Sequence, residues 1–334
     1  SNARIIIIII IIIIATTRLH LYINLVAIVI LSRGKCGLSK CITRYLVAMA
    51  VADLLVIFVD VFLNKINNLY FPLNILFYTP VCSVRIVLMS ATMHSSLWFT
   101  VAFTFDRFVA ICCQTLKPKY CTERTATVVI VILIVFSCSV SIPCYYMFDP
   151  YFILNDTPWY CVLKPSFYTF ATWIAFQRLH RVAAPVFGFA LICLFNALII
   201  RHILMASNIR RRLRGQRNDQ KTIDTELEHR MKSVILLFAI SGSFILLWTT
   251  FVIHSFKWQL SNFNYSETFV NNTRYIIQET GIMLQRLSSC INPCIYGLTQ
   301  TKFREELKKG LMSHIQFWIE HTVLLTVKQN GKLA

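Results

Sequence analysis

Residues 95–113 read SSLWFTVAFTFDRFVAICC. An acid and a guanidinium, Asp106 and Arg107, stand side by side in this stretch, which is otherwise largely apolar. Charged groups are costly to remove from water, and an ionisable residue inside a membrane-spanning segment is a functional candidate by default. We therefore ask first whether this stretch crosses a membrane, and then what the charged pair does there.

The composition of the whole chain answers the first question. Of the 334 residues, 56% are hydrophobic and only 14% are charged, whereas a soluble domain carries about a quarter charged residues. The apolar residues fall in blocks of roughly 20, the length that a helix needs to cross a hydrocarbon core of about 30 Å. Backbone groups find no water there, so such blocks form helices or a closed barrel, and continuous apolar runs favour helices.

Seven blocks are long enough to cross a membrane, which predicts an all-α membrane protein with a seven-helix bundle. We expect the spans at about residues 5–32, 43–63, 83–112, 126–148, 181–204, 233–256 and 275–298. The bundle then occupies residues 19–298, and its first helix extends upstream. Residues 1–18 contain ten consecutive isoleucines and are interpreted as a low-complexity start.

An amphipathic segment follows the last span. In residues 299–312, Phe303, Leu307 and Leu311 share one helical face and charges fill the other. Such a helix lies on the membrane surface, in contact with lipid headgroups. Residues 313–334 are expected to form a cytoplasmic tail.

The charge pattern predicts the orientation in the membrane. The net charge is +18, and the positive residues gather in alternate links, notably residues 33–44 and 201–232. Cytoplasmic links carry this excess, so we expect a multi-pass plasma-membrane protein with its N-terminus outside and its C-terminus in the cytoplasm. No basic–aromatic module accompanies the arginine run, so nucleic acid is not an expected partner.

Glycosylation signals give an independent test of this orientation. The acceptor pattern N-x-[ST] occurs at Asn155, Asn264 and Asn271. All three positions fall in the links between spans four and five or six and seven, which the charge pattern places outside. We therefore expect a glycoprotein.

The opening stretch resembles a known signature. DRFVAIC (106–112) is similar to the D-R-Y-x-A-I-C motif of rhodopsin-like (class A) G-protein-coupled receptors. LVAMAVADL (46–54) resembles their L-A-x-A-D pattern and places Asp53 in mid-membrane, while NPCIY (292–296) matches N-P-x-x-Y. Stretches 94–113, 137–146 and 299–311 most resemble the orphan receptors related to probable G-protein-coupled receptor 139.

The resemblance implies a receptor, not an enzyme. Such a protein binds an extracellular ligand, here an aromatic amino acid or a neuropeptide-like molecule, and activates a heterotrimeric G protein. The implied coupling and switch residues are Asp106, Arg107, Phe108, Phe244, Trp248, Asn292, Pro293 and Tyr296. For Trp248, packing in the core without switching remains an alternative.

The resemblance also implies a disulfide and an ion site. Cys82 and Cys161 stand where relatives form a bridge; two free thiols are the alternative. Relatives hold an allosteric sodium ion with residues that match Asp53, Ser96, Ser289 and Asn292. Oxygen ligands suit this hard cation, and a sodium-free polar network is the alternative. No other cofactor is expected.

Several positions depart from the family pattern. Arg230 occupies the place of an acid that often pairs with the Arg of D-R-Y, and Glu228 is two residues away. Two cations repel, so we predict a weak inactive-state latch and some ligand-independent signalling. Leu247 and Thr250 replace the Cys and Pro around Trp248, which leaves the usual bend of the sixth span in doubt.

Other positions limit the ligand. Met89 stands where amine receptors carry an Asp, and Arg286 stands where opsins carry the Lys that binds retinal. Ligand candidates in the outer halves of the spans are Asp60, Arg85, Met89, His254, Glu279 and Arg286. Mixed acids and bases suit a zwitterion or a peptide terminus, although these groups can instead pair with each other.

Three other classes of protein are alternatives to the receptor. The irregular start of the chain is compatible with a nonfunctional receptor copy. A transporter or channel is disfavoured, because transporters are built from repeats and this chain has an odd number of spans without one. An intramembrane enzyme would need a paired catalytic set, and neither H-E-x-x-H nor G-x-G-D occurs.

Overall fold

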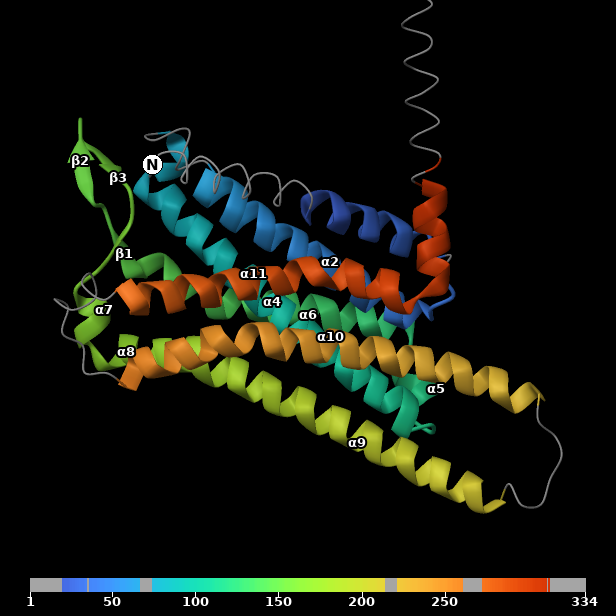
Figure 1. Cartoon of the computed structure of the whole chain (residues 1–334). Coiled ribbons are helices and arrows are strands. Elements are labelled where there is room, and N and C mark those ends of the chain that lie inside the picture. The colour runs from blue at the N-terminus through green and yellow to red at the C-terminus, as the bar shows by residue number, and fades with distance from the viewer. Residues whose placement is uncertain are drawn as a thin grey trace, which may run out of the picture.

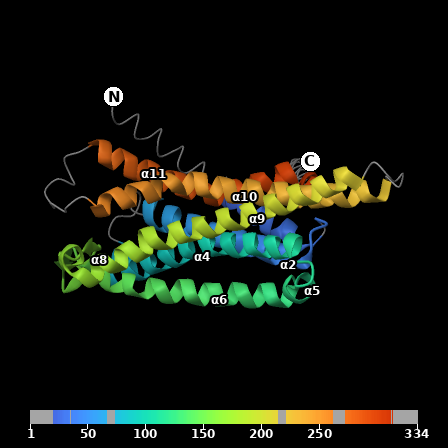
Figure 2. The same cartoon turned by 90° about the horizontal axis from the view of Figure 1, so that it is seen from below.

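The computed structural model describes residues 20–34, 36–66, 74–213, 221–260, 272–310 and 312. In this part of the chain, long helices lie lengthwise against one another as one bundle, and short strands gather at one end, which we call the hairpin end (Figures 1 and 2). The low-complexity start, the tail beyond residue 312, Asn264 and Asn271 lie outside the described residues.

Within the described residues, each of the seven predicted spans is helical. The first is described from His20 to Ser32. The others are α2 (Lys40–Val56) continued by the π-helix η1 (Ile57–Ile66), α4 (Thr79–Cys112), α6 (Glu123–Ser141) continued by η3 (Ile142–Met147), α8 (Ala171–Arg178) continued by the π-helix η4 (Leu179–Ala183) and α9 (Ala184–Leu213), α10 (Lys221–Leu260) and α11 (Asn272–Thr299). Short helices η2 (Ile75–Phe77), α5 (Lys117–Tyr120) and α7 (Ser166–Thr169) lie in the links.

A further helix follows α11. Residues 301–310 are helical, and Figure 1 shows this segment in red, turned across the end of the bundle opposite the hairpins. Phe303 is buried there and packs at 5.9 Å against the ring of Tyr296. This agrees with the amphipathic segment expected after the last span.

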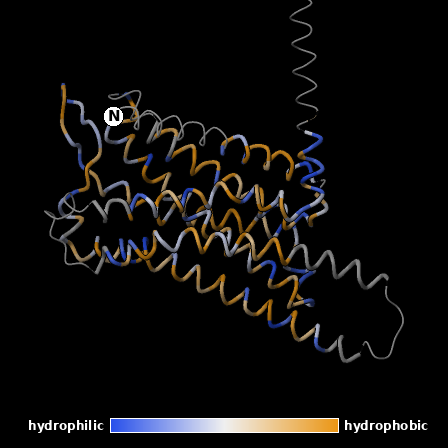
Figure 3. Tube along the Cα trace, viewed as in Figure 1, coloured by the Kyte–Doolittle hydropathy of each residue, from blue (hydrophilic) through white to orange (hydrophobic). Residues whose placement is uncertain are grey.

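The helices have the character of membrane spans. Among the described residues, five helical stretches are long and apolar enough to cross a membrane. Hydrophobic residues run along the bundle, and hydrophilic ones gather at its ends and on the helix 301–310 (Figure 3). On α6, Val131, Ile132 and Val135 are each more than half exposed. An apolar face of this kind is suited to lipid.

Polar side chains fix where two of the helices begin. Ser39 caps α2 by accepting a hydrogen bond from the Ile42 amide, and Thr122 caps α6 through the Thr125 amide. Such caps satisfy amides that lack a partner in the first turn. Arg44 and Glu123 then join the starts of α2 and α6 through an ion pair of 2.6 Å.

The link between α6 and α8 folds over the bundle. Strand β1 (Phe148–Asp149) pairs with β4 (Val162–Leu163), and β2 (Phe152–Leu154) pairs with β3 (Thr157–Trp159), both antiparallel. A disulfide between Cys82 and Cys161 ties this link to the start of α4, which confirms the predicted bridge. Asn155 is exposed at the β2–β3 turn.

The hydrophobic core contains separate clusters that follow one another along the length of the bundle. One cluster, far from the hairpins, includes Tyr45, Phe103 and Tyr296. A second includes Leu97, Phe244 and Trp248, and Trp248 is only 3% exposed. Aromatic side chains thus fill the centre between the two ends.

Candidate functional site

The charged pair lies buried at the end of α4 away from the hairpins. Arg107 donates to the Asp106 carboxylate through Nη2 and, at 3.1 Å, through Nε. The Asp106 side chain is fully buried, and that of Arg107 is 7% exposed. Each charge is therefore compensated by its sequence neighbour, as a buried ion needs.

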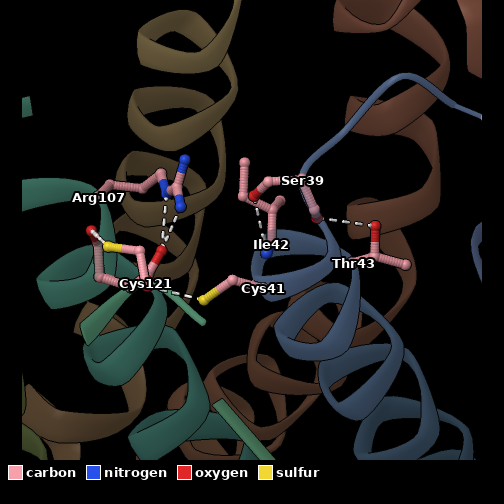
Figure 4. Close-up of polar contacts among 7 residues, drawn as sticks. Ser39, Cys41, Ile42, Thr43, Arg107 and Cys121 are labelled. Carbon is pink, nitrogen blue, oxygen red and sulfur yellow. Dashed lines mark hydrogen bonds and ion pairs between the residues drawn. The ribbon is translucent and has the colours of Figure 1, made fainter. Parts of the chain in front are cut away.

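Two cysteines complete the surroundings of Asp106, and Figure 4 shows both of them, Cys41 and Cys121, near Arg107. The Cys41 thiol at the start of α2 donates to Asp106 Oδ1 at 2.9 Å. The Cys121 thiol, in the link between α5 and α6, lies 3.7 Å from the Asp106 backbone oxygen and donates to it. Burial, and then the Asp106 charge, raise the pKa of Cys121 to about 11, so this thiol keeps its proton at neutral pH.

Phe108 turns away from this polar group into an aromatic cluster. Its ring stacks on Phe195 of α9 with centroids 5.5 Å apart, and Phe105 contacts both Phe195 and Tyr120. The side chains of the D-R-F sequence therefore contact different helices. Asp106 faces α2, whereas Phe108 joins α4 to α9.

A second polar cluster lies in the middle of the bundle. The Asp53 carboxylate is fully buried and accepts hydrogen bonds from Ser96 Oγ at 3.0 Å and from Asn292 Nδ2 at 2.7 Å. The Ser289 side chain also interacts with this carboxylate, and its backbone oxygen accepts from Asn24 Nδ2 at 3.1 Å. The structure thus brings together all four residues predicted for sodium.

This donor set fits a hard cation. It offers a carboxylate and two hydroxyl oxygens from α2, α4 and α11, which is the ligand chemistry of such ions. Asn24 Oδ1 is buried and has no hydrogen-bond partner within the described part of the chain. A sodium ion held by Asp53, Ser96 and Ser289 would link three helices at this depth.

The remaining switch candidates lie between this cluster and the two ends. Trp248 donates from Nε1 to Ser288 Oγ at 2.9 Å, and its ring lies 4.9 Å from that of Phe244. Tyr296 is 1% exposed, and its hydroxyl has no partner among the described residues. Pro293 lies inside α11, where it removes one helical hydrogen bond.

A cavity of about 640 Å³ lies between Trp248 and the hairpin end of the bundle. Its walls come from α4, the link between α6 and α8, the helical run from α8 to α9, and α10 and α11. A volume of this size suits a small molecule or the end of a peptide. Two of the predicted ligand candidates, Met89 and His254, line it, and so does Trp248.

The other charged candidates lie outside the cavity lining. Asp60 of η1 is fully buried and pairs with Arg286 of α11. Arg85 donates to the Leu63 backbone oxygen at 3.1 Å and stands over the Phe77 ring. For Asp60 and Arg286 the structure therefore favours the alternative in which the charges pair. Glu279 is not among the residues that line the cavity.

The wall formed by the helical run from α8 to α9 was not expected from the sequence. The predicted fifth span begins at residue 181, whereas the helix begins at Ala171 and carries Gln177, His180 and Arg181 to the cavity. His180 contacts His94 of α4 with ring centroids 4.0 Å apart. Polar residues in an otherwise apolar segment were the available signal.

Two of the sequence expectations fall on side chains that the structure does not describe. Arg230 and Glu228 belong to α10, whose side chains are described only from residue 234. The predicted repulsion between Arg230 and Arg107 therefore stays a prediction.

Comparison with known proteins extends over nearly the whole bundle. The sequence profile of the 7 transmembrane receptor (rhodopsin family) matches residues 23–296. A C-C chemokine receptor type 1 of Macaca fascicularis is 23% identical over 306 residues, which cover 89% of this chain and 78% of that receptor.

Proposed function

The chain belongs to the rhodopsin family of seven-transmembrane receptors, and from this premise we propose that it binds an extracellular ligand at the hairpin end and activates a heterotrimeric G protein at the Arg107 end. Membership of this family makes it a multi-pass plasma-membrane receptor and not an enzyme.

One observation carries the proposal: a ligand-sized cavity and the buried Asp106–Arg107 pair occupy opposite parts of the same helix. Met89 lines the cavity and precedes Arg107 by 18 residues on α4, about 27 Å of helix. A ligand changes the packing at the far end only if it binds one of two packings more tightly. We place that difference at Trp248, which borders the cavity and packs on Phe244.

In the proposed mechanism, ligand contact with Trp248 favours the packing in which α9 and α10 separate at the Arg107 end. Arg107 then leaves Asp106 and becomes accessible to the G protein. Tyr296 moves inward below Pro293, where α11 lacks one backbone hydrogen bond. A sodium ion at Asp53 would stabilise the inactive packing, in which α9 and α10 are not separated, because it would hold α2, α4 and α11 together.

Two ligand classes are compatible with this site. Trp248 and Phe251 line the cavity and suit an aromatic amino acid. The chemokine receptor among the relatives is named for a protein ligand, which supports a neuropeptide-like ligand whose end enters the cavity. Glycans at Asn155, Asn264 and Asn271, an outer N-terminus and an inner C-terminus complete the proposal.

The test is guanine-nucleotide exchange by purified receptor in lipid nanodiscs with heterotrimeric G proteins. We expect an aromatic amino acid or peptide to accelerate exchange, and the G protein to tighten binding of that ligand, since coupling is reciprocal. Arg107→Gln should lose the accelerated exchange yet still bind ligand. A ligand that binds with the same affinity with and without every G protein tested would contradict the proposal.

Two further measurements address the alternatives. Ligand-dependent ion flux in liposomes would favour a transporter or channel, and absence of the chain from the cell surface would favour a nonfunctional copy. Both readouts are independent of nucleotide exchange.

A further inference from the structure

The lining of the cavity at the hairpin end contains two buried polar atoms that have no hydrogen-bond partner within the described part of the chain. They are His94 Nδ1 of α4 and Gln177 Oε1 of α8, on residues that are 8% and 5% exposed. Buried polar groups are normally paired, because an unpaired one has lost its water without compensation. A molecule that enters the cavity can supply both missing partners.

These two atoms belong to neighbouring residues of the cavity wall. The ring centroid of His94 lies 4.0 Å from that of His180. His180 follows Gln177 by three residues in the same helical run, so both project from the same side of it. His180 already has a polar partner, since its Nε2 lies 3.0 Å from Ser90 Oγ in a hydrogen bond. The unpaired atoms of His94 and Gln177 therefore lie in the same part of the wall.

The unpaired atom of Gln177 is an acceptor. The amide nitrogen of this side chain donates to the Phe167 backbone oxygen at 3.2 Å, and a carbonyl oxygen only accepts, so the amide group cannot be reversed without loss of this bond. A carboxylate has no proton to offer and would leave Gln177 Oε1 unpaired. An ammonium group could donate, but no Asp or Glu lines the cavity among the residues that the structure describes, and a buried charge needs a partner of opposite sign.

The partner that His94 needs depends on which ring nitrogen carries the proton. A protonated Nδ1 needs an acceptor, whereas an unprotonated Nδ1 needs a donor. A primary carboxamide meets both cases together with Gln177, since it has two N–H donors and a carbonyl oxygen. A hydroxyl group meets only the first case, because its single proton is used on Gln177.

The same cavity offers a large apolar surface. Met89, Met93, Leu97, Trp248 and Phe251 line it. Methionine adapts to irregular shapes, and aromatic rings provide large apolar contact areas. This surface fits an aromatic or aliphatic side chain.

From these observations we infer that the ligand ends in an uncharged primary carboxamide on an apolar residue, as in a C-terminally amidated peptide or an N-acylated amino-acid amide. The carboxamide donates to Gln177 Oε1 and pairs with His94 Nδ1, while the apolar side chain lies against Trp248. The inference rests on the proposed function, which makes this cavity the ligand site, and it favours a peptide end over a free amino acid. Arg181 also lines the cavity, but it already interacts within the chain and has no part in this recognition.

The experiment compares matched ligands by calorimetry on the full chain in nanodiscs. The small probes are N-acetylphenylalaninamide, the matching methyl ketone, in which CH₃ replaces NH₂, N-acetylphenylalanine and phenethylamine. We expect the primary amide to bind at least about tenfold more tightly than the other three. A glycine-rich peptide that ends in phenylalanine, as amide or as free acid, distinguishes a peptide end from a small molecule.

Two variants locate the contact. Gln177→Leu removes the acceptor and should reduce the preference for the primary amide over the methyl ketone, a ratio that a general loss of packing would not change. His94→Phe removes Nδ1 but keeps a ring against His180, and it should weaken the primary amide. Arg178→Gln, at the exposed next position, is the control and should change neither quantity. If Gln177→Leu does not fold, the probes on the unaltered chain and His94→Phe still decide.

Three outcomes would overturn the inference: equal binding of the primary amide and the methyl ketone, tighter binding of the acid or the amine, or no binding of any primary amide at millimolar concentration. Binding of the amides without accelerated nucleotide exchange would instead leave the inference standing and contradict the proposed function. Exchange driven only by the acid or the amine would do the reverse.

Discussion

At the scale of single residues, Asp106 explains how a charged pair is accommodated at the end of a membrane helix. Its two carboxylate oxygens divide their partners, since Oδ2 accepts from Arg107 and Oδ1 from the Cys41 thiol of α2. A buried charge that lacks such partners is strongly destabilising. Cys41 therefore anchors the acid, and through it the orientation of Arg107.

We predict that Cys41→Ala raises ligand-independent nucleotide exchange. A thiol is a weak donor, so we take the net contribution of this hydrogen bond as about 0.5–1.5 kcal/mol, roughly a twofold to tenfold change in an equilibrium. Loss of that bond from the inactive packing alone shifts the population toward the active one. The measurement is basal exchange per receptor at the cell surface.

Cys41→Ser restores a donor and should return exchange toward the original level. Cys138→Ala, at an exposed position on α6, is the control and should change nothing. Equal basal exchange in Cys41→Ala and the unaltered chain would show that the thiol does not hold the inactive state.

Arg230 supports a second prediction at this scale. The sequence places a cation where relatives often carry the acid that pairs with Arg107. Arg230→Glu should therefore lower basal exchange several-fold, because attraction replaces repulsion. If basal exchange of the unaltered chain equals that of cells without receptor, and the variant does not lower it, the weak latch is ruled out.

Residues at positions that match the family pattern were predictable from the sequence, including the partners within the Asp53 cluster, whereas partners at other positions were not. Asp53, Ser96, Ser289 and Asn292 lie far apart in the chain, yet the resemblance brought them together and the structure has them in contact. Cys41 carries no comparable signal. Its role depends on how closely α2 packs on α4, which no local pattern encodes.

At the scale of elements, the Asp60–Arg286 pair joins η1 to α11. Asp60 is fully buried, and its second oxygen has no partner in the described part of the chain. Removal of one member of a buried pair leaves an uncompensated charge, which costs about 3–5 kcal/mol, whereas replacement of both by apolar residues is often neutral or stabilising.

We therefore predict opposite outcomes for single and double variants. Asp60→Leu or Arg286→Met alone should lower the thermal unfolding temperature and the amount of receptor at the cell surface. The double variant Asp60→Leu/Arg286→Met should recover both. Thermal unfolding of purified protein measures the effect.

The exposed pair between Arg44 and Glu123 provides the control. Solvent screens such a pair, so Arg44→Ala should leave the unfolding temperature unchanged. A double variant that is as unstable as the worse single variant would show that Asp60 and Arg286 have separate roles.

Spans were predictable as elements because length and apolarity determine them. The true start of the fifth helical run was not predictable: it begins at Ala171, ten residues before the predicted start at residue 181. Residues 177–181 read QRLHR, and a hydropathy criterion ends a span there. The polar face is tolerated because it lines a cavity. The π-helices η1 and η4 also left no signal in the sequence.

At the scale of the whole molecule, function requires that the two ends of the bundle face different compartments. Figures 1 and 2 place the hairpins at one end and the helix 301–310 at the other. The disulfide lies at the hairpin end, and such bonds persist where the environment is oxidising. The basic residues 210–217 lie in and beyond the end of α9, which the positive-inside rule assigns to the cytoplasm.

These independent signs predict one topology, which epitope tags can test on living cells. A tag inserted next to Asn155 should be labelled by antibody without permeabilisation, and Asn155→Gln should reduce the apparent mass by one glycan. Tags inserted after residue 217 or fused to the C-terminus should be labelled only after permeabilisation. Labelling of the residue 217 tag and the C-terminal tag on opposite sides of the membrane would mean that an odd number of spans separates residue 217 from the tail. The link after α9 and the helix 301–310 would then face different compartments, and one G protein could not contact both.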